Sequence, residues 1–207
     1  IHEGDIWITS AEEGNPIRIT KTPENEIWLA WSPDSRMIAS MCYRVQEPTL
    51  HVISTSGGGA TKILSTPARR DGYAWSPDSK EIAVVSDGVI SAIPIGGGKA
   101  REVLDLRDQG IVDSEAWGLS WLSDGKHLAF VSRKVTEDAS PTRIFLVPAE
   151  GGKITMLAAD DDNWKDWLYL SPDSKWISYN SEGDVKTRSE GSIWEADFEE
   201  IVKELAR

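Results

Sequence analysis

Short apolar runs, separated by turn-forming residues, occupy almost the whole chain. One group of runs ends just before a Ser-Pro-Asp type of turn and covers 27–31, 73–75, 117–121 and 167–170. A second group directly follows that turn and covers 37–43, 81–85, 127–131 and 176–179. Runs this short, bounded by Pro, Gly, Asp and Ser, are typical of β-strands. The pattern therefore predicts an all-β chain.

Two further runs complete each unit. The third run covers 50–53, 89–95, 144–147 and 192–196. Glycine-rich turns at 57–59, 96–98 and 151–152 lead from it to a fourth run at 60–64, 100–104 and 153–157. Four consecutive strands joined by short turns predict an antiparallel meander, in which we name the strands a, b, c and d in chain order.

The turn between strands a and b is repeated four times. It reads Trp31-Ser32-Pro33-Asp34-Ser35 in the first copy, and the later copies begin at Trp75, Trp121 and Leu170. The copies are spaced by between forty and fifty residues, a period typical of four-stranded propeller blades. Proline presets the backbone for the first turn position, and Asp or Gly suits the positions that follow. The third copy lacks the proline, and the fourth lacks the tryptophan.

Both ends of the chain carry partial units. The segments 4–9 and 16–20 predict strands c and d of an earlier blade, and the last unit has strands a, b and c only. Asp197 then has the character of a helix N-cap, with Glu200 at the capping-box position. The residues that follow on one helical face are Phe198, Ile201, Val202 and Leu205. We therefore expect blades over 1–197 and a short amphipathic α-helix over 198–207.

The turn, the Ile-Ala type of second strand and the Gly-Gly pair before the last strand together resemble the TolB-type, WD-repeat-like β-propeller repeat. The resemblance extends over nearly the whole chain, as far as Asp197. It implies a β-propeller with four recognisable blades and a partial N-terminal blade. Proteins with this repeat include periplasmic scaffolds, gating propellers of peptidases and some polysaccharide lyases. The resemblance also implies a bacterial protein with a periplasmic or secreted location.

The charge balance narrows the range of partners. Lys and Arg number 22 against 34 Asp and Glu, a formal net charge of −12. A surface this acidic argues against nucleic acid and against anionic membrane surfaces as partners. No apolar run approaches the roughly 18 residues that a membrane span needs. The single cysteine, Cys42, excludes an internal disulfide framework.

The loops between strand d and the next strand a are predicted to surround the mouth of a central channel. The candidate ligand-binding residues there are Glu26, Arg69, Arg70, Asp71, Asp113, Glu115, Asp161, Asp162, Trp164 and Asp166. Carboxylates and guanidinium groups can hydrogen-bond a peptide or sugar, and Trp offers a flat apolar surface. The b–c and d–a loops differ in length between repeats, which favours their face as the interaction surface. A solvated polar rim, with Trp packed between blades, is the alternative interpretation.

Catalytic and metal-binding motifs are not matched. The segment 118–122 lacks the final glycine of a nucleophile elbow, and no phosphate-binding glycine loop is present. The histidines, His2, His51 and His127, are too scattered for a triad or a zinc site. The acidic run 160–163 with Asp166 offers oxygen ligands for Ca²⁺, but it departs from the EF-hand pattern. We expect no cofactor or catalytic residue, with Ca²⁺ as the alternative.

The sequence favours a non-catalytic propeller that binds a protein partner, an extended peptide or an oligosaccharide. One alternative is a carbohydrate-active propeller of the polysaccharide-lyase type, which would use Arg69, Arg70 and Trp164. Another is an accessory or gating propeller of a peptidase whose catalytic domain lies elsewhere. We also expect the turn tryptophans Trp31, Trp75 and Trp121 to be buried between blades.

The partial units at the two ends favour an arc of a larger propeller over a closed four-blade ring. Propellers usually have four to eight blades, and joining these two ends would give one strand c too many. We expect the arc to be completed by further sequence or by a second copy of the chain. Exposed apolar faces at its ends would favour such association.

Overall fold

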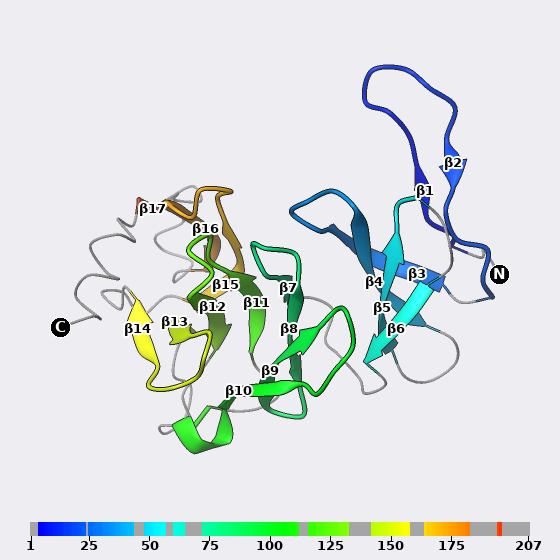
Figure 1. Cartoon of the computed structure of the whole chain (residues 1–207). Coiled ribbons are helices and arrows are strands. Elements are labelled where there is room, and N and C mark those ends of the chain that lie inside the picture. The colour runs from blue at the N-terminus through cyan, green and yellow to red at the C-terminus, as the bar shows by residue number, and fades with distance from the viewer. Residues whose placement is uncertain are drawn as a thin grey trace.

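Four antiparallel sheets follow one another along the chain in the computed structural model, and we call them blades 1 to 4 (Figure 1). The structure describes residues 4–23, 25–43, 48–56, 60–64, 72–111, 116–132, 142–157, 164–182 and 194–195. The one helical segment in these ranges is a 3₁₀ turn, η1 (Arg107–Gln109). The α-helix predicted over 198–207 lies outside them.

Each of the first three blades is a four-stranded meander, and blade 4 has three strands in the described ranges. Blade 1 comprises β3 (Asn25–Trp31), β4 (Met37–Tyr43), β5 (Pro48–Ser54) and β6 (Ala60–Leu64). Blade 2 comprises β7 (Tyr73–Trp75), β8 (Glu81–Ser86), β9 (Val89–Pro94) and β10 (Arg101–Asp105). Blade 3 comprises β11 (Trp117–Trp121), β12 (His127–Ser132), β13 (Arg143–Pro148) and β14 (Thr155–Leu157). Blade 4 comprises β15 (Trp164–Leu170), β16 (Trp176–Glu182) and β17 (Trp194–Glu195). These bounds confirm the predicted strands to within a few residues.

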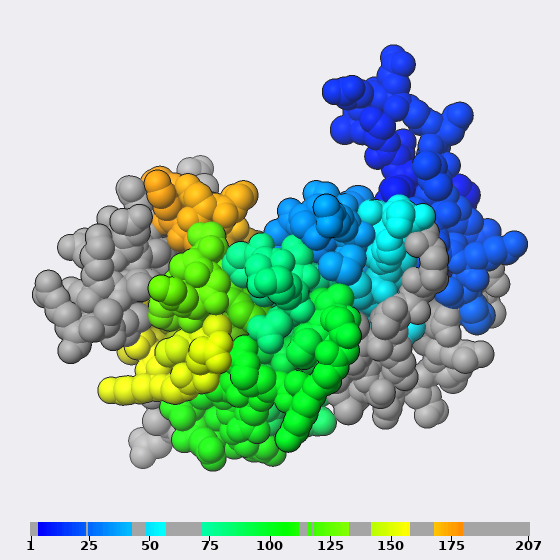
Figure 2. All heavy atoms as spheres, viewed as in Figure 1, coloured from blue at the N-terminus to red at the C-terminus, as the bar shows by residue number. Residues whose placement is uncertain are grey.

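The chain begins with a separate two-stranded sheet. Its strands β1 (Trp7–Ile8) and β2 (Ile17–Arg18) pair antiparallel, with Trp7 opposite Arg18. The loop that joins these strands projects away from the blades in Figures 1 and 2. The prediction of two strands before the first complete blade is therefore confirmed.

The a–b turns are closed by their own side chains. In blade 1 the Ser32 hydroxyl donates to Asp34 Oδ1 at 2.6 Å, and the Ser35 N–H donates to the Ser32 carbonyl at 2.9 Å. The Arg36 N–H also donates to Asp34 Oδ1, at 3.0 Å. Blades 2 and 4 repeat the Ser–Asp bond at 2.7 and 2.6 Å. This local chemistry makes the Ser-Pro-Asp motif a reliable predictor of the turn.

Blade 3 closes its a–b turn differently, because Leu122 replaces the first serine. The His127 imidazole Nδ1 lies 2.7 Å from Asp124 Oδ2 and supplies the side-chain bond to the turn carboxylate. The turn also keeps its backbone bond, from the Gly125 N–H to the Leu122 carbonyl at 3.0 Å. His127 is therefore a structural residue of this turn.

Three apolar cores lie between successive blades. Alternate residues of each strand face the preceding and the following blade, so one sheet contributes to two cores. The core between blades 1 and 2 contains Ala39, Met41, Trp75 and Ile82. The next core contains the stacked rings Phe130 and Phe145 of blade 3, and a third joins blades 3 and 4. This stacking matches the predicted propeller architecture.

The turn tryptophans do not share one environment. Trp75 is 8% exposed, and its indole N–H donates to the Ala30 carbonyl of blade 1 at 3.1 Å. Trp121 is partly buried against blade 2. Trp31 is 53% exposed, so the prediction that it is buried was wrong. Trp75 and Trp121 pack on the blade before their own, whereas in the described chain only the β1–β2 sheet precedes blade 1.

Candidate functional site

The residues predicted to surround the channel mouth lie mostly outside the described part of the chain. These are Arg69, Arg70, Asp71, Asp113, Glu115, Asp161 and Asp162, and the acidic run proposed for Ca²⁺ lies there too. Trp164 and Asp166 lie on β15, where Asp166 is paired with Asn180 of β16. Glu26 is the one candidate whose side chain is described. A ligand site formed by these residues stays a prediction.

Glu26, at the start of β3, has a buried carboxyl group. The residue is 7% exposed, and its Oε1 atom accepts a 2.7 Å hydrogen bond from the Thr22 hydroxyl. Its Oε2 atom is buried without a hydrogen-bond partner in the described structure. Burial raises the pKa of Glu26 above its usual value, the Thr22 hydrogen bond opposes that shift, and the nearby Asp5 charge also raises the pKa.

The polar groups around Glu26 join the N-terminal sheet to blade 1. The Glu26 N–H donates to the Gly4 carbonyl at 3.0 Å, and the Ile6 N–H donates to Thr20 Oγ1 at 2.8 Å. Asp5 forms an ion pair with Arg18 and accepts from the Thr22 N–H at 3.4 Å. The contacts of Glu26 in this structure are therefore those of a structural clamp. Sequence reasoning missed the clamp because these partners come from separate segments of the chain.

Hydrogen bonds between turns of neighbouring blades form a second feature that the sequence did not reveal. Ser79 of blade 2 accepts from the Asp34 N–H of blade 1 at 3.1 Å. Ser174 of blade 4 accepts from the Ser123 N–H of blade 3 at 2.7 Å. The donor in blade 1 lies one position further along its turn, because Pro33 has no N–H. These bonds connect the a–b turns on one face of the propeller.

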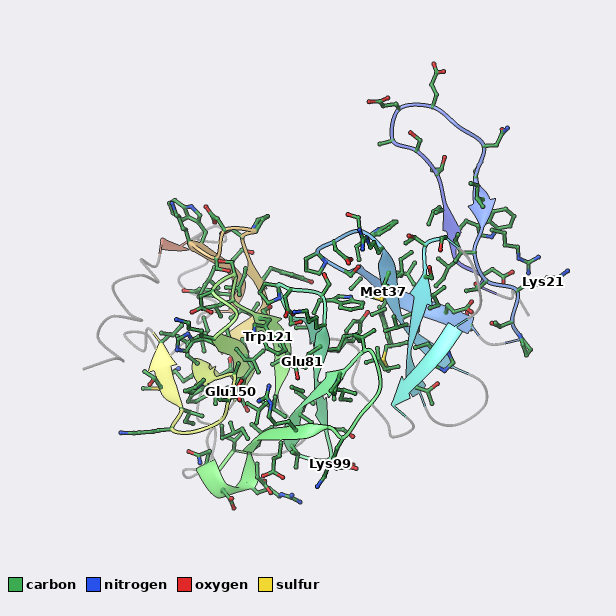
Figure 3. The ribbon with its side chains drawn as sticks, in the orientation of Figure 1. Lys21, Met37, Glu81, Lys99, Trp121 and Glu150 are labelled. Atoms are coloured by element: carbon green, nitrogen blue, oxygen red, sulfur yellow. The ribbon has the colours of Figure 1, made fainter. Side chains whose placement is uncertain are left out.

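The interface between blades 2 and 3 is bridged in another way. Gly125 stands where the other turns have serine, so it has no hydroxyl to accept such a bond. Arg101 of β10 instead contacts Glu81 at 3.3 Å, Glu150 at 3.8 Å and the Ala149 carbonyl. Figure 3 labels Glu81 and Glu150 on the two blades that this guanidinium joins.

The turn carboxylates are held in their ionised form by the turns themselves. The serine hydroxyl, followed by the backbone N–H of the next basic residue, lowers the pKa of Asp34, Asp78 and Asp173. The Arg107 side chain does the same for the pKa of Asp105. These groups serve local structure, and the described ranges hold no group of three or more His, Cys, Asp or Glu arranged to bind a metal ion.

Six of the seven large apolar side chains that are exposed in the described ranges lie at the two ends of the row of blades, and the seventh, Met156, lies on β14 of blade 3. Leu29 and Trp31 of β3 are 50% and 53% exposed. The other exposed apolar residues at the N-terminal end are Trp7 and Ile17, and those on blade 4 are Tyr169 and Trp176. Within the described ranges no helix is long and apolar enough to cross a membrane.

Comparison with solved structures assigns the fold. The chain is similar to TolB from Acinetobacter baumannii, with a TM-score of 0.69 at 18% identity, over 91% of this chain and 45% of that protein. A putative TolB from Agrobacterium tumefaciens gives a TM-score of 0.66 at 18% identity, over 90% of this chain and 66% of that one. This chain has the TolB-type β-propeller fold. It spans less than two thirds of either TolB chain.

Two other solved structures share the propeller fold. A chain of a nidogen/laminin complex gives a TM-score of 0.60 at 16% identity, over 80% of this chain and 60% of that one. A prolyl endopeptidase gives 0.60 at 15% identity, over 92% of this chain and 32% of the peptidase. No protein-family model and no curated protein matches the sequence. At these identities the similarity establishes the fold alone.

Proposed function

We propose that this chain is a non-catalytic propeller scaffold that binds a protein partner through the face carrying its b–c and d–a loops. The difference between the two faces supports this proposal. The a–b turns of blades 1, 2 and 4 repeat one set of internal bonds. On the other face, Asp87-Gly88 alone joins β8 to β9, whereas residues 133–142 join β12 to β13, and η1 follows β10. Variable loops on a rigid repeated framework are where repeat proteins usually bind.

The candidate residues at the mouth fit a partner that offers hydrogen-bond donors or basic groups. Seven of the ten are carboxylates, and a net charge of −12 would guide a basic protein surface towards the chain. The nidogen/laminin neighbour comes from a complex between proteins, which is in line with a binding role for this architecture. A periplasmic or secreted location, suggested by the TolB neighbours, belongs to the same proposal.

A second candidate function is that of an accessory propeller acting beside a peptidase domain. The similarity to a prolyl endopeptidase, of which this chain would cover 32%, favours it. The described residues would have the same scaffold role in this case, and the partner would be a catalytic domain or its peptide substrate.

Photo-crosslinking from the two faces of blade 2 tests the proposal. Asp108 of η1 is exposed on the loop side, where the Leu106 N–H donates to the Gly88 carbonyl at 2.8 Å. Lys99, labelled in Figure 3, is also exposed and lies in the c–d turn on the opposite face. A photoreactive phenylalanine analogue at 108 should form a specific protein adduct in native extract, whereas the same analogue at 99 should form none.

The identity of the adduct separates the two candidates, because a peptidase captured from position 108 would support the accessory role. The triple variant Asp113→Asn, Glu115→Gln, Asp161→Asn, which neutralises three of the mouth carboxylates, should lose the adduct, while Arg36→Ala on the turn face should keep it. Adducts formed only from position 99, or equally from both positions, would refute binding through the loop face.

A further inference from the structure

The contact between the β1–β2 sheet and blade 1 has an apolar part and a polar part. The apolar part is made by isoleucines from both sides, which are Ile6, Ile8, Ile19, Ile38 and Ile53. The polar part is the clamp around Glu26, in which the Glu26 N–H donates to the Gly4 carbonyl and the Ile6 N–H donates to Thr20 Oγ1. A group that changes its charge within this clamp therefore acts directly on the attachment of the sheet.

Two carboxyl groups share the clamp. The Asp5 side chain and the Glu26 residue are each only 7% exposed. Thr22 bonds to both of them, because its N–H donates to Asp5 Oδ1 at 3.4 Å and its hydroxyl donates to Glu26 Oε1 at 2.7 Å. The two carboxyl groups are therefore neighbours in a site with little access to water.

The positive charge in the clamp is already committed. The Arg18 guanidinium pairs with Asp5, and its Nε donates to the Thr20 carbonyl at 2.9 Å. Within the described ranges Glu26 has no ion-pair partner, and its Oε2 atom is buried without a hydrogen bond. Ionisation of Glu26 therefore places an uncompensated negative charge beside Asp5.

A buried charge without a partner is unfavourable, so the neutral acid suits this site better than the carboxylate. Burial raises the pKa of Glu26 above its ordinary value, the Thr22 and Thr20 hydroxyls act against that shift, and Asp5 adds to it. Arg18 does not reverse the balance, because its charge is matched by Asp5.

Few other titratable groups face Glu26 from the elements around it. Cys42 stands directly opposite Glu26 in the pairing of β3 with β4, and His51 of β5 lies further along the same face, opposite Ser40. Lys21, labelled in Figure 3, is exposed. Histidine is the residue type that titrates near neutral pH, so His51 is the competing group that an experiment must separate from Glu26.

We propose that Glu26 makes the attachment of the β1–β2 sheet to blade 1 depend on pH, so that the sheet is clamped when this carboxyl group is protonated and loosened when it is ionised. The clamped state binds more protons than the loosened state, because the pKa of Glu26 is raised only while the carboxyl group is buried. The clamp is therefore complete in acid and weakens as the pH rises from the ordinary pKa of a glutamate to the raised pKa. Loosening exposes Ile38 and Ile53, which the sheet covers.

This dependence is opposite in sign to that of the turn carboxylates. The turns lower the pKa of Asp34, Asp78 and Asp173, so their contribution to stability is lost in acid and not at neutral pH. A local measurement on the clamp is therefore needed, together with a reference inside a blade.

Amide hydrogen exchange, followed by NMR and corrected for the intrinsic rate at each pH, provides that measurement. The reporters are the N–H groups of Ile6 and Glu26, and the reference is the Val85 N–H, which donates to the Gly72 carbonyl at 2.7 Å in blade 2. Between about pH 4.5 and about pH 8, protection of Ile6 and Glu26 should fall severalfold, whereas protection of Val85 should not fall.

Four variants assign the effect to one group. Glu26→Gln keeps the size of the side chain but cannot ionise, so protection of Ile6 should stay high at every pH. Glu13→Gln, on the exposed loop of the same sheet, and His51→Gln should behave like the original chain. Thr22→Val removes a hydroxyl that lowers the pKa of Glu26, so the fall in protection should be larger and extend to higher pH.

Protection of Ile6 and Glu26 that does not fall with rising pH in the original chain would overturn the proposal. The same fall in folded Glu26→Gln, or its loss in His51→Gln alone, would overturn it in favour of another titrating group. If Glu26→Gln does not fold, Thr22→Val decides, because a pH profile identical to that of the original chain would show that the Glu26 carboxyl group does not control the clamp.

Discussion

Two tryptophans at the same position of the same repeat should differ sharply in their contribution to stability. Trp75 is 8% exposed and its indole N–H is bonded to the Ala30 carbonyl, whereas Trp31 is 53% exposed. Burying roughly 200 Å² of an aromatic side chain is worth about 5 kcal/mol at 25 cal/mol per Å². The half-exposed Trp31 keeps about half of that area from water, so burial of Trp31 contributes at most about 2.5 kcal/mol to the stability of the fold.

Replacing Trp75 also leaves a cavity and removes a hydrogen bond, and both effects increase the difference in stability between the two variants. Trp75→Ala should destabilise the protein by about 3–5 kcal/mol, as is usual for large core residues replaced by alanine. It also removes the hydrogen bond from the indole N–H to the Ala30 carbonyl. Trp31→Ala should cost about 1–2 kcal/mol, because neighbouring groups and water fill the space at a surface.

Urea unfolding followed by far-ultraviolet circular dichroism measures both variants against the original chain. The midpoint for Trp75→Ala should be the lower of the two by a margin equivalent to at least about 1.5 kcal/mol. Trp121→Ala, which removes a partly buried indole, should fall between them. Equal losses for Trp31 and Trp75 would show that the turn motif itself, and not the blade before it, determines the contribution of the tryptophan.

Three further predictions concern the turns and close contacts between blades. Gly118→Ala should destabilise the protein by several kcal/mol, because φ is +63° and the new Cβ would lie 2.9 Å from the Leu168 nitrogen. Gly125→Ala, at φ +68°, places its Cβ in open space and should destabilise the protein by about 1 kcal/mol. Similar melting temperatures for the two variants would contradict this reasoning. Ser79→Ala should lower the free energy of unfolding, measured by chemical denaturation, by about 1 kcal/mol more than Ser35→Ala does. The two serines share a positive φ, but only the Ser79 hydroxyl accepts a hydrogen bond from the Asp34 N–H of the neighbouring blade. The turns lower the pKa of Asp34, Asp78 and Asp173, so in acid the unfolded chain binds more protons than the folded chain. The free energy of unfolding that these carboxylates contribute should therefore be fully present above about pH 5 and decline as the pH falls below about 4. Calorimetry should show a weaker decline when Ser32, Ser76 and Ser171 are all replaced by alanine, and an unchanged decline would show that other groups cause it.

The strands and their turns were readable from the sequence because both depend on short-range chemistry. A serine two residues before an aspartate closes its own turn, so the motif predicts an a–b hairpin wherever it occurs. The repeat period then gives the number of blades, because each unit buries its apolar faces only against its neighbours. The same local chemistry explains the exception in blade 3, where His127 takes the role of the missing serine, although the sequence did not predict that contact.

The candidate site was less accessible to such reasoning. Glu26 was selected as a rim carboxylate, yet it is buried against Thr22 and close to Asp5, which belong to the segments before blade 1. The solvation of a carboxyl group depends on what the fold places around it, and no local pattern records that.

The covering of each blade face was likewise decided only by the tertiary structure. Trp31 and Trp75 stand in the same five-residue motif, Trp-Ser-Pro-Asp-Ser, so nothing local distinguishes them. One indole is buried and the other half exposed, because a complete blade precedes Trp75, whereas the described residues before blade 1 form two short strands. Strand formation depends on a few neighbouring residues, but burial depends on the opposite surface, which reaches its place only when the chain has folded.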